Sequence, residues 1–311
     1  MSTASSTRPK NPAGISRRRF LESSLTIGAA AVAAAAGEKS ATPTLGGPWQ
    51  IGCYTRPWGA YDWRVALDAI AEAGFKHAGL MTANTKTGLV ISAATTVDEA
   101  RAVGEECRKR GLQVPSLWGG GFAVAKSLEA GIQDLTRLID NCAACGAANL
   151  MIGGTGDPRI ADDYYKAVAE VCDYAAAKKI GLSVKPHGGQ NATGAQCRKI
   201  VEKVGKKNFG LWYDPGNIYY YSNGELDPVE DAAGVDGIVV GMSVKDFRPP
   251  KEVMVTPGTG QVNFAAVMAR LRRGGFTRGP LVIECLEKGD LPKLAVEARK
   301  ARRFLDELLG R

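Results

Sequence analysis

Short apolar segments alternate with amphipathic segments from Trp49 to the C-terminal end of the chain. The apolar segments have the length and flanking turn residues of β-strands, and the segments between them carry apolar residues at helical spacing. The predicted strands are Trp49–Tyr54, Lys76–Met81, Gln113–Trp118, Asn149–Ile152, Leu182–Val184, Phe209–Tyr213, Ile238–Val244 and Leu281–Ile283. This repeated strand–helix unit predicts a closed (β/α)8 barrel as a single domain over residues 49–311. An open, doubly wound sheet fits less well, because no Gly-x-Gly-x-x-Gly motif follows the first strand.

The segment before the barrel has the pattern of a signal peptide. Ser16–Leu21 is a twin-arginine motif, and an alanine-rich apolar run from Leu25 to Ala36 follows it. This run is too short to span a bilayer and ends in an Ala-x-Ala pattern typical of a cleavage site. We expect residues 1–36 to be a twin-arginine signal peptide and residues 37–48 a linker. The export machinery is then a partner, the mature protein is periplasmic, and no membrane attachment is expected after cleavage.

The charge of the chain gives no support to a nucleic-acid-binding role. Residues 1–36 carry five Lys and Arg residues and one Glu, a net charge of +4, so the mature chain keeps +4 of the formal +8. No basic stripe interleaved with aromatic residues appears in the sequence.

The seven cysteines are irregularly spaced, and the Cys142–Cys145 pair lies in a predicted helix with no second such pair. Buried, unpaired thiols are therefore expected.

Polar and aromatic residues gather at the ends of the predicted strands, where barrel enzymes hold their catalytic groups. They are Arg56, Trp118, Lys185, His187, Asp214, Asn217, Lys245, Asp246 and Glu284. Asp214 ends an apolar strand, so its carboxylate needs a metal, a cation or a substrate hydroxyl as partner. The local alternative is that Asp214 only caps a turn, because Pro215 follows it. Of the two histidines, His77 near a strand start suggests packing and His187 suggests function.

Four motifs carry a resemblance to a known family. They are Tyr213–Asn217, Val244–Phe247, Pro257–Phe264 and Val282–Glu284. In this order they resemble the xylose-isomerase-like TIM-barrel family, which contains sugar isomerases and epimerases. The resemblance covers residues 49 to 309, and it implies a xylose isomerase-like TIM barrel. Its motifs are specific for the family and poorly specific for the substrate. The apurinic-endonuclease branch of the same fold is excluded, because its zinc cluster needs more histidines than this chain has.

The resemblance also implies one divalent metal (Mn, Mg, Zn or Co) held by Glu, Asp, His and Glu from the later strands. Asp214 and Glu284 match two of these positions, whereas Lys185 and Ser243 replace the usual Glu and His. One expectation is a three-ligand metal site of His187, Asp214 and Glu284, with open positions for water or substrate. The alternative is that the ammonium group of Lys185 takes the place of the metal charge.

The activity that the resemblance implies is proton abstraction next to a carbonyl of a sugar. This chemistry needs a base, and a cation or metal that holds the developing oxyanion. Glu284 is the expected base or metal ligand, with His187 as the alternative base. Lys185, Lys245 or a metal is the expected electrophile. The expected substrate-binding residues are Trp118 and Tyr213, whose rings can face a sugar, with Asn217, Arg56 and Asp246.

Two features narrow the expected substrate to a non-phosphorylated or oxidised sugar. Sugar phosphates are cytoplasmic, and no arginine cluster suited to a phosphate occurs at the strand ends. Two alternatives stay open. One is a keto-glycoside lyase, since elimination passes through the same enediolate. The other is a catalytically reduced, periplasmic sugar-binding protein or partner subunit, because two of the usual metal positions differ. The sequence defines neither the sugar nor the oligomeric state.

Overall fold

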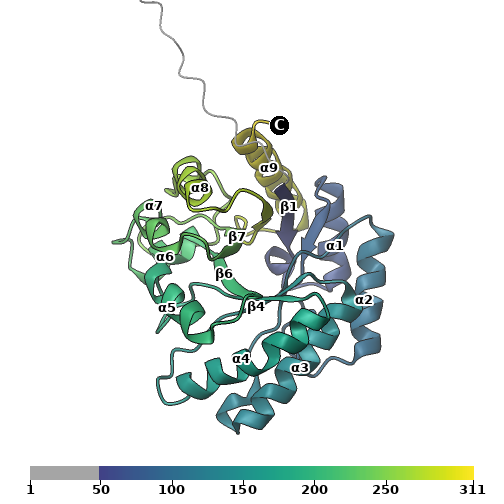
Figure 1. The fold of residues 1–311 in the computed structure, drawn as a ribbon. Coiled ribbons are helices and arrows are strands. Elements are labelled where there is room, and N and C mark those ends of the chain that lie inside the picture. The colour runs from purple at the N-terminus through teal and green to yellow at the C-terminus, as the bar shows by residue number, and fades with distance from the viewer. Residues whose placement is uncertain (1–48) are drawn as a thin grey trace, which may run out of the picture. The chain divides into compact units, whose positions relative to one another are not determined.

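The computed structural model describes residues 49–311, which form a parallel eight-stranded barrel with helices around it (Figure 1). The strands are β1 (Trp49–Tyr54), β2 (His77–Gly79), β3 (Leu117–Trp118), β4 (Asn149–Ile152), β5 (Gly181–Val184), β6 (Phe209–Tyr213), β7 (Val239–Val244) and β8 (Gly279–Ile283). Their order is β2-β1-β8-β7-β6-β5-β4-β3. Parallel bridges from His77 to Gln113 and from Leu80 to Leu117 connect β2 to β3, so the barrel is nearly closed. The predicted (β/α)8 fold is confirmed.

Every α-helix except α4 begins where a side chain accepts a hydrogen bond from a free N–H group of the first turn. They are α1 (Trp63–Glu72), α2 (Val97–Lys109), α3 (Leu128–Cys145), α4 (Ala161–Ala177), α5 (Gly194–Val204), α6 (Pro215–Tyr221), α7 (Pro228–Asp231), α8 (Phe264–Arg273) and α9 (Leu291–Leu309), with 3-10 turns η1 (Arg56–Trp58), η2 (Ala123–Ala125) and η3 (Ala232–Val235). Thr96 and Thr193 each form a capping box with the residue three positions on. Local sequence therefore fixes most helix starts.

Helix α6 was not predicted. The Pro215-Gly216 pair suggested a turn after β6, yet Pro215 starts a helix that runs to Tyr221. Proline is well suited to the first helical position, because its missing N–H would have no partner there. Asp214 caps this helix by accepting a hydrogen bond from the backbone N–H of Asn217 at 2.9 Å.

The strands separate two layers of buried side chains. Inside the barrel lie Tyr54, Met81, Met151, Trp212 and Val282, with Trp118 packed against them. The larger layer lies between the strands and the helices, and it includes Tyr213, Val244 and Ile283. Because successive strand residues point to opposite faces, β1, β4, β6 and β8 each contribute to both layers. All seven cysteines are buried and unpaired.

The predicted signal peptide and linker lie outside the residues that the structure describes. Among residues 49–311, no helix has the length and apolar composition needed to cross a membrane.

Candidate active site

Four charged side chains point inward at the carboxyl ends of four consecutive strands. Lys185 follows β5, Asp214 follows β6, Lys245 follows β7 and Glu284 follows β8. The residue before each of them packs outward against the helices, so the alternation of the strand turns the charged residue toward the barrel axis. Their exposed fractions are between 0 and 2%. The structure therefore brings together four residues that are far apart in sequence.

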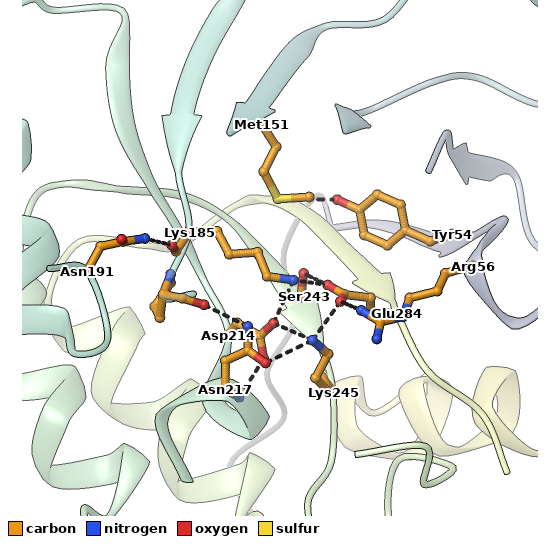
Figure 2. Close-up of polar contacts among 11 residues, drawn as sticks. Tyr54, Arg56, Met151, Lys185, Asn191, Asp214, Asn217, Ser243, Lys245 and Glu284 are labelled. Atoms are coloured by element: carbon orange, nitrogen blue, oxygen red, sulfur yellow. Dashed lines mark hydrogen bonds and ion pairs between the residues drawn. The ribbon is translucent and has the colours of Figure 1, made fainter. Parts of the chain in front are cut away.

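The four groups form a ring in which positive and negative charges alternate (Figure 2). Lys185 Nζ lies 2.9 Å from Asp214 Oδ2 and also contacts Glu284 Oε2. Lys245 Nζ lies 3.1 Å from Asp214 Oδ2 and 2.6 Å from Glu284 Oε1. Each ammonium group thus bridges both carboxylates. Buried like charges repel strongly, and this alternation is the arrangement that offsets their repulsion.

Glu284 accepts a hydrogen bond or ion pair at each of its lone-pair positions. Oε1 contacts Arg56 Nη1 at 2.7 Å as well as Lys245, and Oε2 accepts from Ser243 Oγ at 2.7 Å as well as from Lys185. A carboxylate has about four such positions, so Glu284 is saturated. Burial acts to raise the pKa of Glu284, but the charges of Lys185, Lys245 and Arg56 hold that pKa well below its usual range. This argues against Glu284 as the base, because a carboxylate whose lone-pair positions all have donors has none free to accept a proton from a substrate.

Asp214 uses its two oxygens differently. Oδ1 caps α6, whereas Oδ2 faces both ammonium groups, although neither is aligned for a hydrogen bond. Asn217, at the start of α6, accepts a hydrogen bond from Lys245 Nζ at 3.0 Å and donates one to the carbonyl of Pro186 at 2.6 Å. Asn217 is buried, and it therefore positions Lys245 and the loop after β5.

The environments of the two lysines move their pKa values in opposite directions. Burial is the largest effect on Lys185 and lowers its pKa. The nearby positive charge of Lys245 acts in the same direction, whereas the negative charges of Asp214 and Glu284 act to raise that pKa. Burial also acts to lower the pKa of Lys245, but the two carboxylates prevail and raise it above its usual value. Paired titratable groups with diverging pKa values are a mark of sites that transfer protons. Lys185 therefore holds its proton less tightly than Lys245.

Four side chains next to the cluster reach the solvent. The side chain of Arg56 is 32% exposed, His187 is exposed, and Trp118 and Tyr221 are half-buried. The His187 ring lies 5.4 Å from that of Trp118 and 5.7 Å from that of Tyr221, measured between centroids. Although His187 is exposed to water, partial desolvation by its neighbours, together with the charges of Lys185 and Lys245, lowers its pKa to about 4. The imidazole is therefore neutral at pH 7.

Two expected substrate-binding residues have other roles. Asp246 is buried and accepts four backbone N–H groups, two of them from Gly258 and Gly260 at 3.0 and 2.8 Å. It anchors the loop after β7 instead of facing the barrel mouth. Tyr213 points outward from β6, and its hydroxyl donates to the carbonyl of Pro228 and contacts Asp231. Its ring is fully buried and is not available to a sugar.

Sequence reasoning missed two residues at the site. Tyr221 lies on the unpredicted helix α6 and packs against His187. Asn191 donates through Nδ2 to the carbonyls of Gly153 and Lys185, at 2.6 and 2.7 Å, so it ties the ends of β4 and β5 together. Figure 2 shows the bond to Lys185. The one sequence signal for Asn191 was the Gly153-Gly154 pair after β4. A Cβ at Gly154 would lie 2.5 Å from the Asn191 side chain, so glycine at this position leaves room for that side chain.

Comparison with known families identifies the chain. The family described as Xylose isomerase-like TIM barrel matches residues 67–308, which is most of the barrel. The chain belongs to this family. A probable L-ribulose-5-phosphate 3-epimerase from Mycoplasma pneumoniae is 29% identical over 147 residues, which are 46% of this chain and 46% of that protein. The chain thus matches about half the length of this curated relative.

Two solved structures share the xylose isomerase-like fold. A xylose isomerase domain protein from Planctomyces limnophilus has a TM-score of 0.65 at 19% identity and covers 84% of this chain and 98% of its own. A D-psicose 3-epimerase determined in the presence of D-fructose has a TM-score of 0.67 at 15% identity and covers 84% of this chain and 100% of its own. At these identities the likeness concerns the fold.

The residues of this member do not fit the divalent metal that the family resemblance implies. No three His, Cys, Asp or Glu side chains within residues 49–311 lie together as metal ligands, so the expected set of His187, Asp214 and Glu284 is not assembled. Asp214 Oδ2 is the one carboxylate oxygen of the cluster without an aligned hydrogen bond, and it already faces two ammonium groups. A cation added between the carboxylates would meet these ammonium groups at contact distance.

Proposed function

We propose that this protein is a sugar isomerase or epimerase that moves a proton at the carbon next to a carbonyl. The observation that carries the proposal is the cluster of two carboxylates and two ammonium groups at the carboxyl ends of β5 to β8, with Arg56 and His187 beside it at the solvent. Barrel enzymes hold their reacting groups at this end. The names of the relatives, an L-ribulose-5-phosphate 3-epimerase and a D-psicose 3-epimerase, support the same reaction class.

The proposed roles follow from protonation and access. His187 is the proposed base, because a neutral imidazole keeps one nitrogen lone pair for a proton and this ring is exposed beside Trp118. Arg56 and Lys185 are the cations that hold the negative charge developing on the carbonyl oxygen, since removal of the proton leaves an enediolate. Lys185 Nζ lies 5.7 Å from the ring centroid of Trp118, so a sugar on that ring would be next to the ammonium group.

The substrate that we propose is a non-phosphorylated or oxidised sugar. The sequence of residues 1–36 supports export by the twin-arginine route to the periplasm, where free sugars are the available substrates. Replacement of Arg17 and Arg18 by lysine, followed by fractionation of the cells, tests this location. Retention of the variant in the cytoplasm supports export by this route, and unchanged distribution contradicts it.

Solvent exchange tests the proposed chemistry without knowledge of the product. The protein is incubated in deuterated buffer with D-fructose, D-psicose and 3-keto-glycosides, and deuterium at the carbon next to the carbonyl is followed by NMR. We expect exchange that is lost in His187→Gln. The matched control is His77→Gln, because His77 lies at the start of β2 and its Nδ1 contacts the carbonyl of Ile51. Equal loss in both variants, or exchange that survives His187→Gln, contradicts the assignment.

The burial of the charged ring favours a second candidate, a sugar-binding protein without turnover. All four ring members are at most 2% exposed and are paired with one another, so each must move or lose a partner before it meets a substrate. A binding protein would be stabilised by its sugar against heat, through preferential binding to the folded state. Stabilisation without solvent exchange supports this candidate, and exchange supports the enzyme.

A further inference from the structure

The position of the Lys185 ammonium group has a consequence for the metal chemistry of the barrel. Its Nζ lies between Asp214 and Glu284, in contact with one oxygen of each. Lys245 contacts the same two carboxylates from β7. The two carboxylates and two ammonium groups are neutral as a set, and Arg56 adds one positive charge. A divalent ion would bring the site to an excess of three positive charges around a buried cluster, at a high cost in free energy.

The hydrogen bonds of Glu284 lead to the same conclusion by a different route. A metal ligand must offer a lone pair to the ion, but those of Glu284 are used by Arg56, Lys245, Lys185 and Ser243. Ser243 donates its hydroxyl hydrogen to Glu284, so it supports the carboxylate instead of competing for a metal. Entry of a metal would require that at least one charged donor leave a buried position.

We propose that the ammonium groups of Lys185 and Lys245 permanently replace a divalent metal ion in this barrel, so that the protein carries its central cation as part of its own chain. This inference concerns the charge at the site, and it stands whether the protein turns over a sugar or only binds one. It predicts that the site has no specific affinity for Mn²⁺, Mg²⁺, Zn²⁺ or Co²⁺ while Lys185 is present.

A single substitution should reverse this property. Lys185→Glu changes the local charge by two units, which equals the charge of one divalent ion. The new carboxylate would face Asp214 and Glu284, and three buried carboxylates require a cation between them. Ser243 contacts Glu284, so Ser243→His would place an imidazole next to the same position. The double variant then offers three carboxylates and an imidazole, a set suited to a divalent transition metal.

The test measures metal content and melting temperature in the full protein, the Lys185→Glu variant and the double variant, each with chelator and with added Mn²⁺ or Co²⁺. We expect the parent to melt at the same temperature in both conditions and to hold no equimolar metal after dialysis. The variants should be stabilised by the ion, because a ligand that binds the folded state raises its stability. The control is Lys203→Glu, which makes the same lysine-to-glutamate change in the exposed ion pair with Asp162.

The outcomes separate the alternatives. Equimolar metal in the parent that stabilises it and is lost in Asp214→Asn overturns the proposal. Metal that remains in Asp214→Asn is bound elsewhere and leaves the proposal supported. If Lys185→Glu folds but neither it nor the double variant responds to metal more than Lys203→Glu does, the proposal is also overturned. If both Lys185 variants fail to fold, the measurements on the parent and on Asp214→Asn decide.

Discussion

Removal of one cation from the buried ring is the perturbation that tests its electrostatics most directly. Lys185→Met keeps the length of the side chain but removes its contacts with Asp214 and Glu284. Breaking a buried ion pair typically costs about 3–5 kcal/mol, because the partner is left charged and unpaired. Here Lys245 still bridges both carboxylates and Arg56 still contacts Glu284, so we expect a loss of about 3 kcal/mol, at the lower end of that range.

Thermal unfolding at pH 7.5 in the presence of chelator measures this loss. For a domain of this size, about 3 kcal/mol corresponds to a decrease in melting temperature of roughly 6–12 °C. The control is Lys203→Met, whose partner Asp162 is 95% exposed, and which should leave the melting temperature nearly unchanged. If Lys185→Met melts like Lys203→Met, the ring does not stabilise the fold and the reasoning is refuted.

Three further results are expected. Asp246→Asn should lower stability by about 3 kcal/mol in urea unfolding, because an amide has a single acceptor oxygen for the backbone N–H groups that the carboxylate holds. Tyr213→Phe should cost about 1 kcal/mol and leave sugar exchange unchanged, since only its buried hydrogen bonds are lost. The pKa of His187 is about 4 in the folded state, below its unfolded value of about 6.5, so its contribution to stability is present above pH 6.5 and lost as the pH falls from 6.5 toward 4. Unfolding between these pH values should therefore depend less on pH in His187→Gln, and an unchanged slope would contradict the assigned shift.

The fold was predictable because its signals are local and repeated. Strands β4 and β6 begin and end where the sequence indicates, at Asn149–Ile152 and Phe209–Tyr213. Strand β3 is shorter than predicted, and Pro115 explains the difference. Proline has no N–H to donate to a neighbouring strand, so regular pairing begins only at Leu117, while Gln113 and Val114 make isolated bridges.

The site was predictable in position but not in orientation. The rule that polar residues follow barrel strands located Lys185, Asp214, Lys245 and Glu284. It did not separate inward from outward side chains, and Tyr213 was misassigned for that reason. Side chains alternate between the two faces of β6, and Tyr213 immediately precedes the inward Asp214. Tyr213 therefore points outward.

Loop contacts were beyond the reach of sequence patterns. Asn191 acts through hydrogen bonds to two carbonyls on different strand ends, and no local spacing encodes such a pairing. Asp246 has the same character, because three of its four backbone partners lie 12 to 16 residues further along the chain.

The burial of the ring also sets the order in which a substrate can reach it. Of the groups that contact Glu284, Ser243, Lys185 and Lys245 are buried, and Arg56 is the one with substantial exposure. Arg56 contacts Glu284 through Nη1 and is 32% exposed, so other guanidinium N–H groups remain available to a substrate. A sugar oxygen entering at this end of the barrel would therefore meet Arg56 before the two buried lysines. Access through Arg56 links the two candidate functions. A sugar that contacts only Arg56 would be bound without reaction. A sugar that displaces Arg56 from Glu284 would reach Lys185 and Lys245, the cations needed to hold an enediolate.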